Sequence, residues 1–129
     1  MTTTSQLIRF AIAGTIGFVV DAGVLYLALA CGLGPFAGRA VSFLAAVWVT
    51  WRINRRYTFR GRVERSVWAE WWRYLISMTG GASVNYAVYS LVIVAGRHGP
   101  VLPLLGVACG SIAGMAVNFF AAKFWAFRN

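Results

Sequence analysis

Long apolar runs alternate with short basic segments along the chain. Residues 10–30 contain one charged side chain, that of Asp21, and residues 74–96 and 101–122 contain none. A helix needs about 20 predominantly apolar residues to cross the hydrocarbon core of a bilayer. Each run is close to that length, so the pattern predicts three membrane-spanning helices.

A shorter apolar run occupies residues 40–50, between Arg39 and Arg52. It reaches spanning length if its helix begins near Pro35 and the two arginine side chains extend to the membrane interfaces. With this run included, the sequence predicts an all-α integral membrane protein with four transmembrane helices.

The basic residues are unevenly divided among the segments that join these helices. Arg39 and Arg97 lie in the first and third turns, whereas the other ten of the 12 Lys and Arg residues lie near the termini or between residues 51 and 73. Cytoplasmic segments carry the excess of positive charge in membrane proteins. We therefore expect both termini and the middle segment to be cytoplasmic.

The middle segment contains the amphipathic stretch VERSVWAEWWRYL, residues 63–75. Its apolar side chains recur at helical spacing, at Val67, Trp68, Trp71, Trp72 and Leu75. This pattern is typical of a short interfacial helix that lies on the cytoplasmic leaflet and leads into the third span. Aromatic residues that anchor the third span at the interface would give the same pattern.

The composition agrees with a membrane protein and argues against other classes. Hydrophobic residues make up 60% of the chain and charged residues 12%, whereas soluble domains have about 25% charged residues. The net charge of +9 is also typical of nucleic-acid binding, but the chain lacks the polar surface that such a domain needs. Neither the two cysteines nor the single histidine has metal-site spacing, and no catalytic or cofactor motif is present. We therefore expect no enzyme, metal or cofactor.

The chain contains an internal repeat. A shift of 64 residues places RFAIAGTIGFVVDAG on RYLISMTGGASVNYA, so that Gly17 corresponds to Gly81 and Asp21 to Asn85. A shift of 68 residues places WRINRRYTFR on FFAAKFWAFR. We expect a single domain, residues 1–129, that consists of two parallel two-helix repeats, about 7–60 and 71–128, related by an axis along the membrane normal.

Small residues at four-residue spacing form one face of each predicted helix. Helices pack closely through such faces because lipid supplies no hydrophobic drive for their association. Polar residues lie on the same faces: Asp21, Asn54, Asn85 and Asn118. A carboxylate at the centre of a membrane helix costs about 2.5–3.5 kcal/mol, so Asp21 should face the bundle or a wet cavity, or be protonated. The asparagines should either join helices by hydrogen bonds or serve a polar path.

Four stretches carry a family resemblance: Arg9-Phe10 with Gly14 and Gly17, RAVSF at 39–43, NRRYTFR at 54–60, and VNFFAAKFWAFR at 117–128. Together they resemble the GtrA-like family of small bacterial membrane proteins, over nearly the whole chain. Ala122 departs from the pattern, because a polar residue often stands there. The resemblance implies a multi-pass protein of the bacterial cytoplasmic (inner) membrane. Its implied function is the translocation, or flipping, of polyprenyl-phosphate-linked sugars for cell-envelope polysaccharide synthesis or glycosylation.

The resemblance also suggests a substrate-binding role for the basic motif that ends the second helix. Guanidinium groups bind phosphate through paired hydrogen bonds. We expect the substrate phosphate to contact Arg52, Asn54, Arg55 and Arg56, with Lys123 as the counterpart in the second repeat and Arg39 receiving the head group after transit. A polar path would pass Asp21, Asn85 and Asn118. The arginines are equally explained if they only orient the protein.

Two other functions fit the sequence. The chain can be a membrane anchor or scaffold subunit that recruits a glycosyltransferase through its middle segment. It can also be a small proton-coupled multidrug exporter, with Asp21 as its membrane carboxylate, although such exporters lack so basic a middle segment. Four helices enclose little surface around a polyprenyl phosphate, so we expect a homo-oligomer surrounded by membrane lipids. The row Gly106, Gly110 and Gly114 is its candidate contact.

Overall fold

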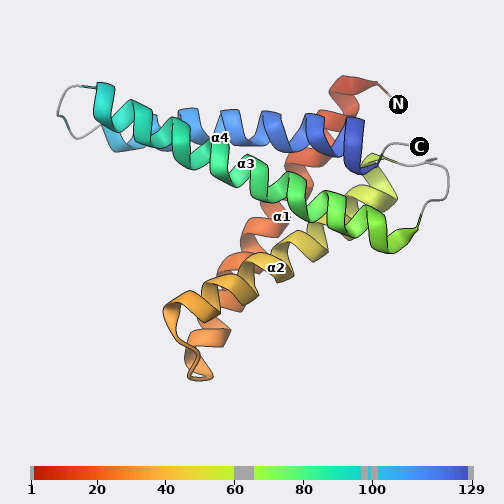
Figure 1. Cartoon of the computed structure of the whole chain (residues 1–129), viewed down its shortest axis with the longest axis horizontal. Coiled ribbons are helices and arrows are strands. Elements are labelled where there is room, and N and C mark those ends of the chain that lie inside the picture. The colour runs from red at the N-terminus through yellow and green to blue at the C-terminus, as the bar shows by residue number, and fades with distance from the viewer. Residues whose placement is uncertain (1, 60–65, 97–98, 100–101, 128–129) are drawn as a thin grey trace. The chain divides into compact units, whose positions relative to one another are not determined.

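The structure is a computed structural model that describes residues 2–59, 66–96, 99 and 102–127 (Figure 1). Its elements are α1 (Thr3–Ala30), α2 (Pro35–Ile53), η1 (Asn54–Thr58), α3 (Val67–Ala95), α4 (Leu102–Ala121) and η2 (Ala122–Ala126). The elements η1 and η2 are π-helices. The described residues contain helices and no strand, which confirms the all-α prediction.

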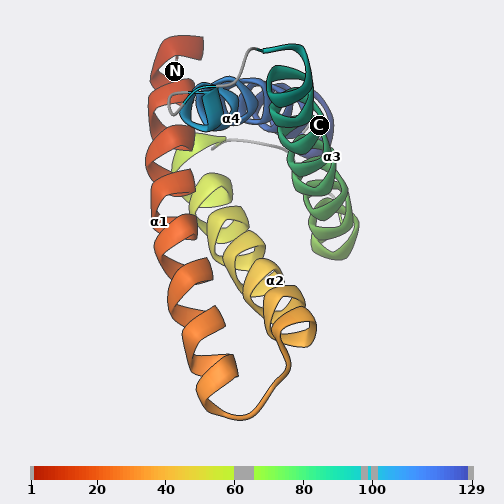
Figure 2. The same ribbon diagram turned by 90° about the vertical axis from the view of Figure 1, so that its left-hand side faces the viewer.

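These elements form two units, and each unit is a helical hairpin. The first unit contains α1, α2 and η1, and the second contains α3, α4 and η2. Within each unit the two long helices lie side by side and run in opposite directions (Figure 1 and Figure 2). The packed interior of each hairpin is therefore the seam between its two helices.

The turn of the first hairpin depends on a glycine. Gly32 has a φ of 91°, in the left-handed region that glycine adopts without strain. The N–H groups of Gly32 and Leu33 donate to the carbonyls of Leu29 and Ala28 over 3.1 and 3.0 Å, which is the Schellman pattern of a helix end. Helix α2 then begins at Pro35, the start that the second apolar run needs to reach spanning length. Proline suits this position because the first helical residues have no intrahelical partner for their N–H groups.

Small residues let α1 and α2 approach closely. A Cβ atom on Gly17 would collide with the side chain of Thr50, and one on Gly38 would lie 3.6 Å from the Cβ of Ala28. Ala13 and Ser42 are fully buried. The predicted packing of helices through their small faces is confirmed in this hairpin.

The second hairpin closes even more tightly. A Cβ on Gly81 would collide with the side chain of Asn118, and one on Gly110 would lie 2.6 Å from the carbonyl oxygen of Asn85. On Gly114 it would lie 2.8 Å from the carbonyl oxygen of Gly81. The glycine row of α4 is thus used inside the hairpin. It is not a free face for a second copy, in contrast to the contact suggested for it from the sequence.

Each hairpin ends in a π-helix whose following ring packs back onto the first helix of the pair. The N–H groups of Phe59 and Phe127 donate to the carbonyls five residues earlier, over 2.8 and 2.9 Å. Phe59 meets Phe10 edge-on with ring centroids 6.3 Å apart, and Phe127 meets Tyr74 in the same way at 5.6 Å. Edge-to-face contacts are a favoured geometry for aromatic pairs. The two hairpins are therefore closed by the same kind of contact.

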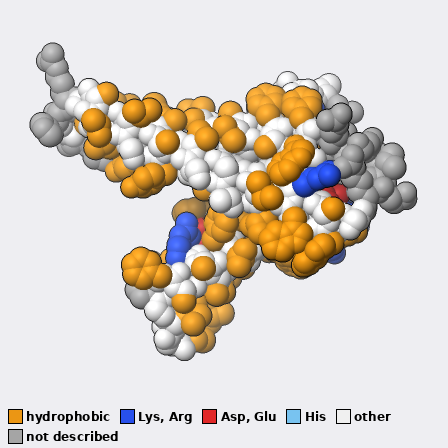
Figure 3. Space-filling model, in the orientation of Figure 1, with side chains coloured by type: hydrophobic (Ala, Val, Ile, Leu, Met, Phe, Trp, Pro, Cys, Tyr) orange, Lys and Arg blue, Asp and Glu red, His pale blue; other side chains and the backbone are white. Residues whose placement is uncertain are grey.

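The described chain is that of a membrane protein. Three helical segments are long and apolar enough to cross a membrane: Thr3–Ala30, Val67–Ala95 and Leu105–Ala126. Large apolar side chains are exposed on their surfaces (Figure 3), as expected for a protein surrounded by lipid. Helix α2 has 19 residues and contains Arg39 and Arg52, so its crossing of the membrane stays a prediction.

The residues expected to form a short interfacial helix instead belong to α3. Val67–Ala95 is one helix of 29 residues, and its N-cap Ser66 accepts a hydrogen bond from the N–H of Ala69 at 3.4 Å. No glycine or proline interrupts residues 67–75, so nothing separates the amphipathic turns from the rest of α3. Residues 60–65 of the middle segment lie outside the described residues.

The seam of the second hairpin predicts opposite effects for two Gly→Ala substitutions. Gly110→Ala should lower the thermal unfolding temperature of the purified protein in detergent, because the new Cβ meets backbone of α3 and overpacking costs about 1–3 kcal/mol. Gly80→Ala is the matched control, since a Cβ there has no atom within 4 Å and alanine favours the helix. An unfolding temperature for Gly110→Ala at or above that of the control would contradict the close packing.

Candidate anion-binding site

The arginine-rich segment lies where α2 passes into η1. Arg52 is in the last turn of α2, and Arg55 and Arg56 are in η1; all three side chains are exposed. Asn54 is only 1% exposed, and its Oδ1 accepts a hydrogen bond from the Thr58 hydroxyl at 2.8 Å. The buried amide of Asn54 therefore lies on the inner side of the π-helix η1, while the arginines lie on its exposed side.

An open pocket of about 380 Å³ is lined by Arg52, Ile53, Arg55, Arg56 and Tyr57. The Arg52 guanidinium lies 5.6 Å from the ring centroid of Trp48, and that of Arg56 lies 5.6 Å from the ring of Tyr57. Contacts of this length are cation–π interactions and restrain both arginines. Three guanidinium groups beside an apolar and an aromatic side chain suit an anion that is attached to an apolar group. Asn54 was expected here with the arginines, but it does not line the pocket.

Helix α1 contacts Tyr57, one of the residues that line this pocket. The Nη1 of Arg9 donates a hydrogen bond to the carbonyl oxygen of Tyr57 at 3.2 Å. The next residue, Phe10, makes the ring contact with Phe59. The sequence marked the Arg9-Phe10 pair as part of the family resemblance, but no local pattern indicated that it reaches a residue 48 positions later.

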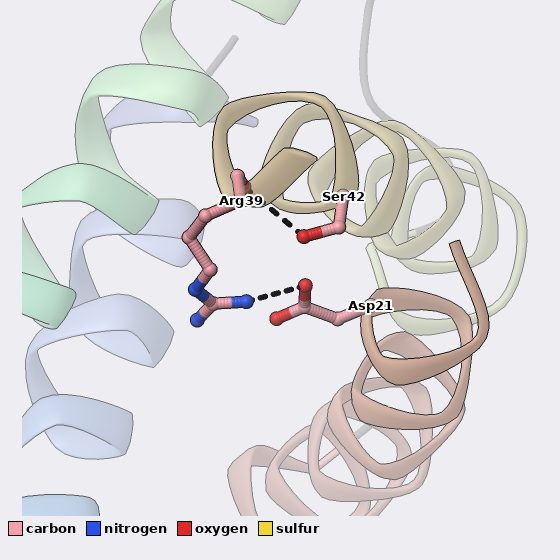
Figure 4. A network of polar contacts seen from close by, with 3 residues as sticks. All are labelled: Asp21, Arg39 and Ser42. Carbon is pink, nitrogen blue, oxygen red and sulfur yellow. Dashed lines mark hydrogen bonds and ion pairs between the residues drawn. The ribbon is translucent and has the colours of Figure 1, made fainter. Parts of the chain in front are cut away.

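A second polar group lies nearer the turn of the first hairpin. The Nη1 of Arg39 donates to Oδ1 of Asp21 at 2.5 Å, and the Ser42 hydroxyl donates to the Arg39 carbonyl at 3.0 Å (Figure 4). The Asp21 side chain is 17% exposed and that of Arg39 is 58% exposed. The ion pair offsets part of the cost of a carboxylate within a membrane helix.

The sequence did not pair Asp21 with Arg39. Asp21 lies nine residues before the end of α1, and Arg39 lies four residues after the start of α2. Their main chains are therefore at different levels of the hairpin, and the long arginine side chain covers the difference. Only the antiparallel register of the two helices, which local patterns do not define, could have indicated this pair.

The corresponding positions of the second hairpin have a different chemistry. The Nζ of Lys123 lies 5.9 and 5.4 Å from the rings of Phe119 and Phe124. Under the shift of 68 residues, Phe120 and Phe124 stand where the first hairpin has Arg52 and Arg56. Among the described residues of this segment, the lysine therefore lies beside aromatic rings, and Phe120 and Phe124 take the places of two arginines.

The two asparagines predicted for a polar path both lie at the seam of the second hairpin. Asn85 of α3 is packed against Gly110 and Gly114, and Asn118 of α4 is packed against Gly81. The Oδ1 atom of Asn118 is buried and has no hydrogen-bond partner among the described residues. Asp21 belongs to the other unit, so a path that joins all three residues stays a prediction.

A family model described as the GtrA/DPMS transmembrane domain matches residues 9–127. The match includes both hairpins, the arginine pocket and the Asp21–Arg39 pair. No curated protein matches the chain. Because the family model covers nearly the whole sequence, the chain belongs to the GtrA/DPMS transmembrane domain family.

Proposed function

We propose that this protein translocates a polyprenyl-phosphate-linked sugar across the bacterial cytoplasmic membrane, in support of cell-envelope polysaccharide synthesis or glycosylation. Membership of the GtrA/DPMS family is consistent with a membrane function related to polyprenyl-phosphate sugars. The observation that carries the proposal is the pocket at the end of α2, where three arginines adjoin Ile53 and Tyr57. It combines the donors that a phosphate needs with apolar surface for the group attached to it.

In this proposal α2 also crosses the membrane, which gives four spans in total. Both termini and the middle segment are cytoplasmic. The two hairpins are copies of one unit, related by an axis along the membrane normal. Equivalent features within each hairpin support the repeat itself: each has a π-helix at its end, an edge-on ring pair beside it, and a glycine of the first helix packed on a polar residue of the second. The arginine pocket then lies at the cytoplasmic surface, where a newly made lipid-linked sugar presents its phosphate.

The pocket binds the phosphate first. Arg55 and Arg56 donate hydrogen bonds to the phosphate oxygens, and Arg52 adds a third cation beside them. Guanidinium groups suit this task because their planar donors match two oxygens of one phosphate. Asn54, which the sequence placed among the ligands, acts through its buried hydrogen bond to Thr58 by holding the π-turn that presents the arginines.

The head group then moves past the polar side chains of the spans. Asp21, Asn85 and Asn118 line the path, Lys123 contributes a point charge from the second hairpin, and Arg39 receives the phosphate at the outer side. A homo-oligomer would enclose the polyprenyl chain more completely than one copy does.

A scaffold for a glycosyltransferase is the second candidate. It is favoured by Trp68 and Trp72, which are 67% and 45% exposed at the start of α3 and whose rings meet edge-on with centroids 5.6 Å apart. A scaffold moves no lipid when it is purified alone, so reconstitution separates the two functions. A proton-coupled exporter is less well supported, because Asp21 is engaged by Arg39.

Substitution of the pocket arginines by lysine tests the proposed grip on the phosphate. Arg55→Lys/Arg56→Lys keeps the positive charge and should leave topology unchanged, but it removes the planar paired donors. A charge-assisted hydrogen bond contributes about 1.5–3 kcal/mol, so affinity for a short-chain prenyl-phosphate glucose should fall about tenfold or more. The affinity is measured by calorimetric titration in detergent, and the topology by a reporter fused after the C-terminus.

The matched control is Arg73→Lys, an arginine of α3 that does not line the pocket. This variant should bind the lipid as the wild type does. If Arg55→Lys/Arg56→Lys binds and transports the lipid as the wild type does, these arginines serve only to orient the protein in the membrane.

The role assigned to Asn54 predicts a specific coupling. Asn54→Ala and Thr58→Val should each lower the unfolding temperature, because each removes the hydrogen bond between these two buried side chains, at a cost of about 1–3 kcal/mol. The double variant should be less destabilised than the sum of the two single variants. Additive losses of stability, or a loss of lipid affinity in Asn54→Ala without a loss of stability, would favour direct contact with the phosphate.

A further inference from the structure

The Asp21–Arg39 pair leaves a large part of Arg39 open to another anion. The Arg39 side chain is 58% exposed. In the described part of the chain its guanidinium forms one ion pair, from Nη1 to Oδ1 of Asp21. A guanidinium also has N–H donors on Nε and on its second Nη. Arg39 can therefore hold the carboxylate through one nitrogen and present the others outward.

The pair is not needed to close a hairpin of this kind. Under the two shifts that align the repeat, Asn85 and Val107 of the second hairpin take the places of Asp21 and Arg39. Helices α3 and α4 nevertheless pack closely. An ion pair whose arginine is 58% exposed contributes little to stability. The charges of the first hairpin therefore have a purpose other than packing.

The position of the pair indicates that purpose. Arg39 precedes Arg52 by 13 residues on the same helix, a rise of about 20 Å. The pair and the arginine pocket thus lie toward opposite ends of α2. The first hairpin therefore has two guanidinium sites along one helix: the arginine pocket, and Arg39 with its carboxylate partner.

We propose that Asp21 competes with the phosphodiester of the translocated lipid for Arg39. This inference rests on the proposed function. Without lipid at this end, Asp21 neutralises Arg39. An arriving phosphate takes over the guanidinium, and return of the carboxylate displaces the phosphate again. Asp21 is thus a positioning residue that determines how long the phosphate stays at this end of the hairpin.

The wild-type protein offers a direct test, because Asp21 is the one aspartate of the chain. Protein made with carbon-13 in the aspartate carboxyl group gives one side-chain signal by NMR, and its absence in Asp21→Asn assigns it. Titration with a short-chain prenyl-phosphate glucose in detergent should shift this signal as Arg39 leaves the carboxylate. An unchanged signal while the lipid binds would overturn the proposal. An equal shift with phosphatidylglycerol or inorganic phosphate would overturn the assignment to the translocated lipid.

Transport kinetics in liposomes test the consequence. In Asp21→Asn the half-saturating lipid concentration should fall about two- to fivefold, the range of one partly exposed ion pair, and the maximal rate should fall with it because release is slower. In Asp21→Asn/Arg39→Gln the decrease in half-saturating concentration should be absent, since the effect acts through Arg39. A purely structural role would instead lower the unfolding temperature and the rate without changing half-saturation, which would overturn the proposal.

Different outcomes contradict the proposed function and the proposed role of Asp21. If the wild type neither binds nor moves the prenyl-phosphate sugar, the proposed function fails and the role of Asp21 fails with it. If the wild type moves the lipid and Asp21→Asn leaves the half-saturating concentration unchanged, only the role of Asp21 fails.

Discussion

The close approach of two helices at each seam is the constraint on which the rest of the structure depends. Lipid gives no hydrophobic reward for bringing helices together, so contact between them must come from packing and polar groups. Gly17 in the first hairpin and Gly110 and Gly114 in the second leave no room for a Cβ. This proximity sets the register of each pair, and the register in turn brings Arg9 to Tyr57 and Arg39 to Asp21.

The two hairpins have the same closing contacts and different charges. Both have a π-helix and an edge-on ring pair at the end. In the described residues, arginines line a pocket in the first hairpin, and at the corresponding positions of the second hairpin aromatic residues lie around Lys123. In the proposed mechanism the first hairpin therefore supplies the arginine pocket that binds the anion, and the second supplies Lys123 and the two asparagines of the path.

Much of the fold could be predicted because it depends on local patterns. Apolar runs indicated the helices, and the small-residue rows indicated the seams; the start of α2 at Pro35 is the one that a spanning second helix required. The π-helices could not be predicted, since a bond to the carbonyl five residues earlier has no sequence pattern of its own. For that reason Asn54 was placed with its charged neighbours although its side chain is buried. The partner of Asp21 was missed because it depends on the register of two helices, which packing over their whole length decides.

The central claim is that this chain moves a polyprenyl-phosphate-linked sugar through the bilayer without another protein. It is tested most directly with purified wild-type protein in liposomes that contain a fluorescent prenyl-phosphate sugar in both leaflets, to which a membrane-impermeant quencher is added. Translocation predicts that the whole lipid pool becomes quenched, and that the Arg55→Lys/Arg56→Lys protein slows this markedly. Quenching limited to the outer leaflet, as in liposomes without protein, would contradict the claim and leave the scaffold as the better account.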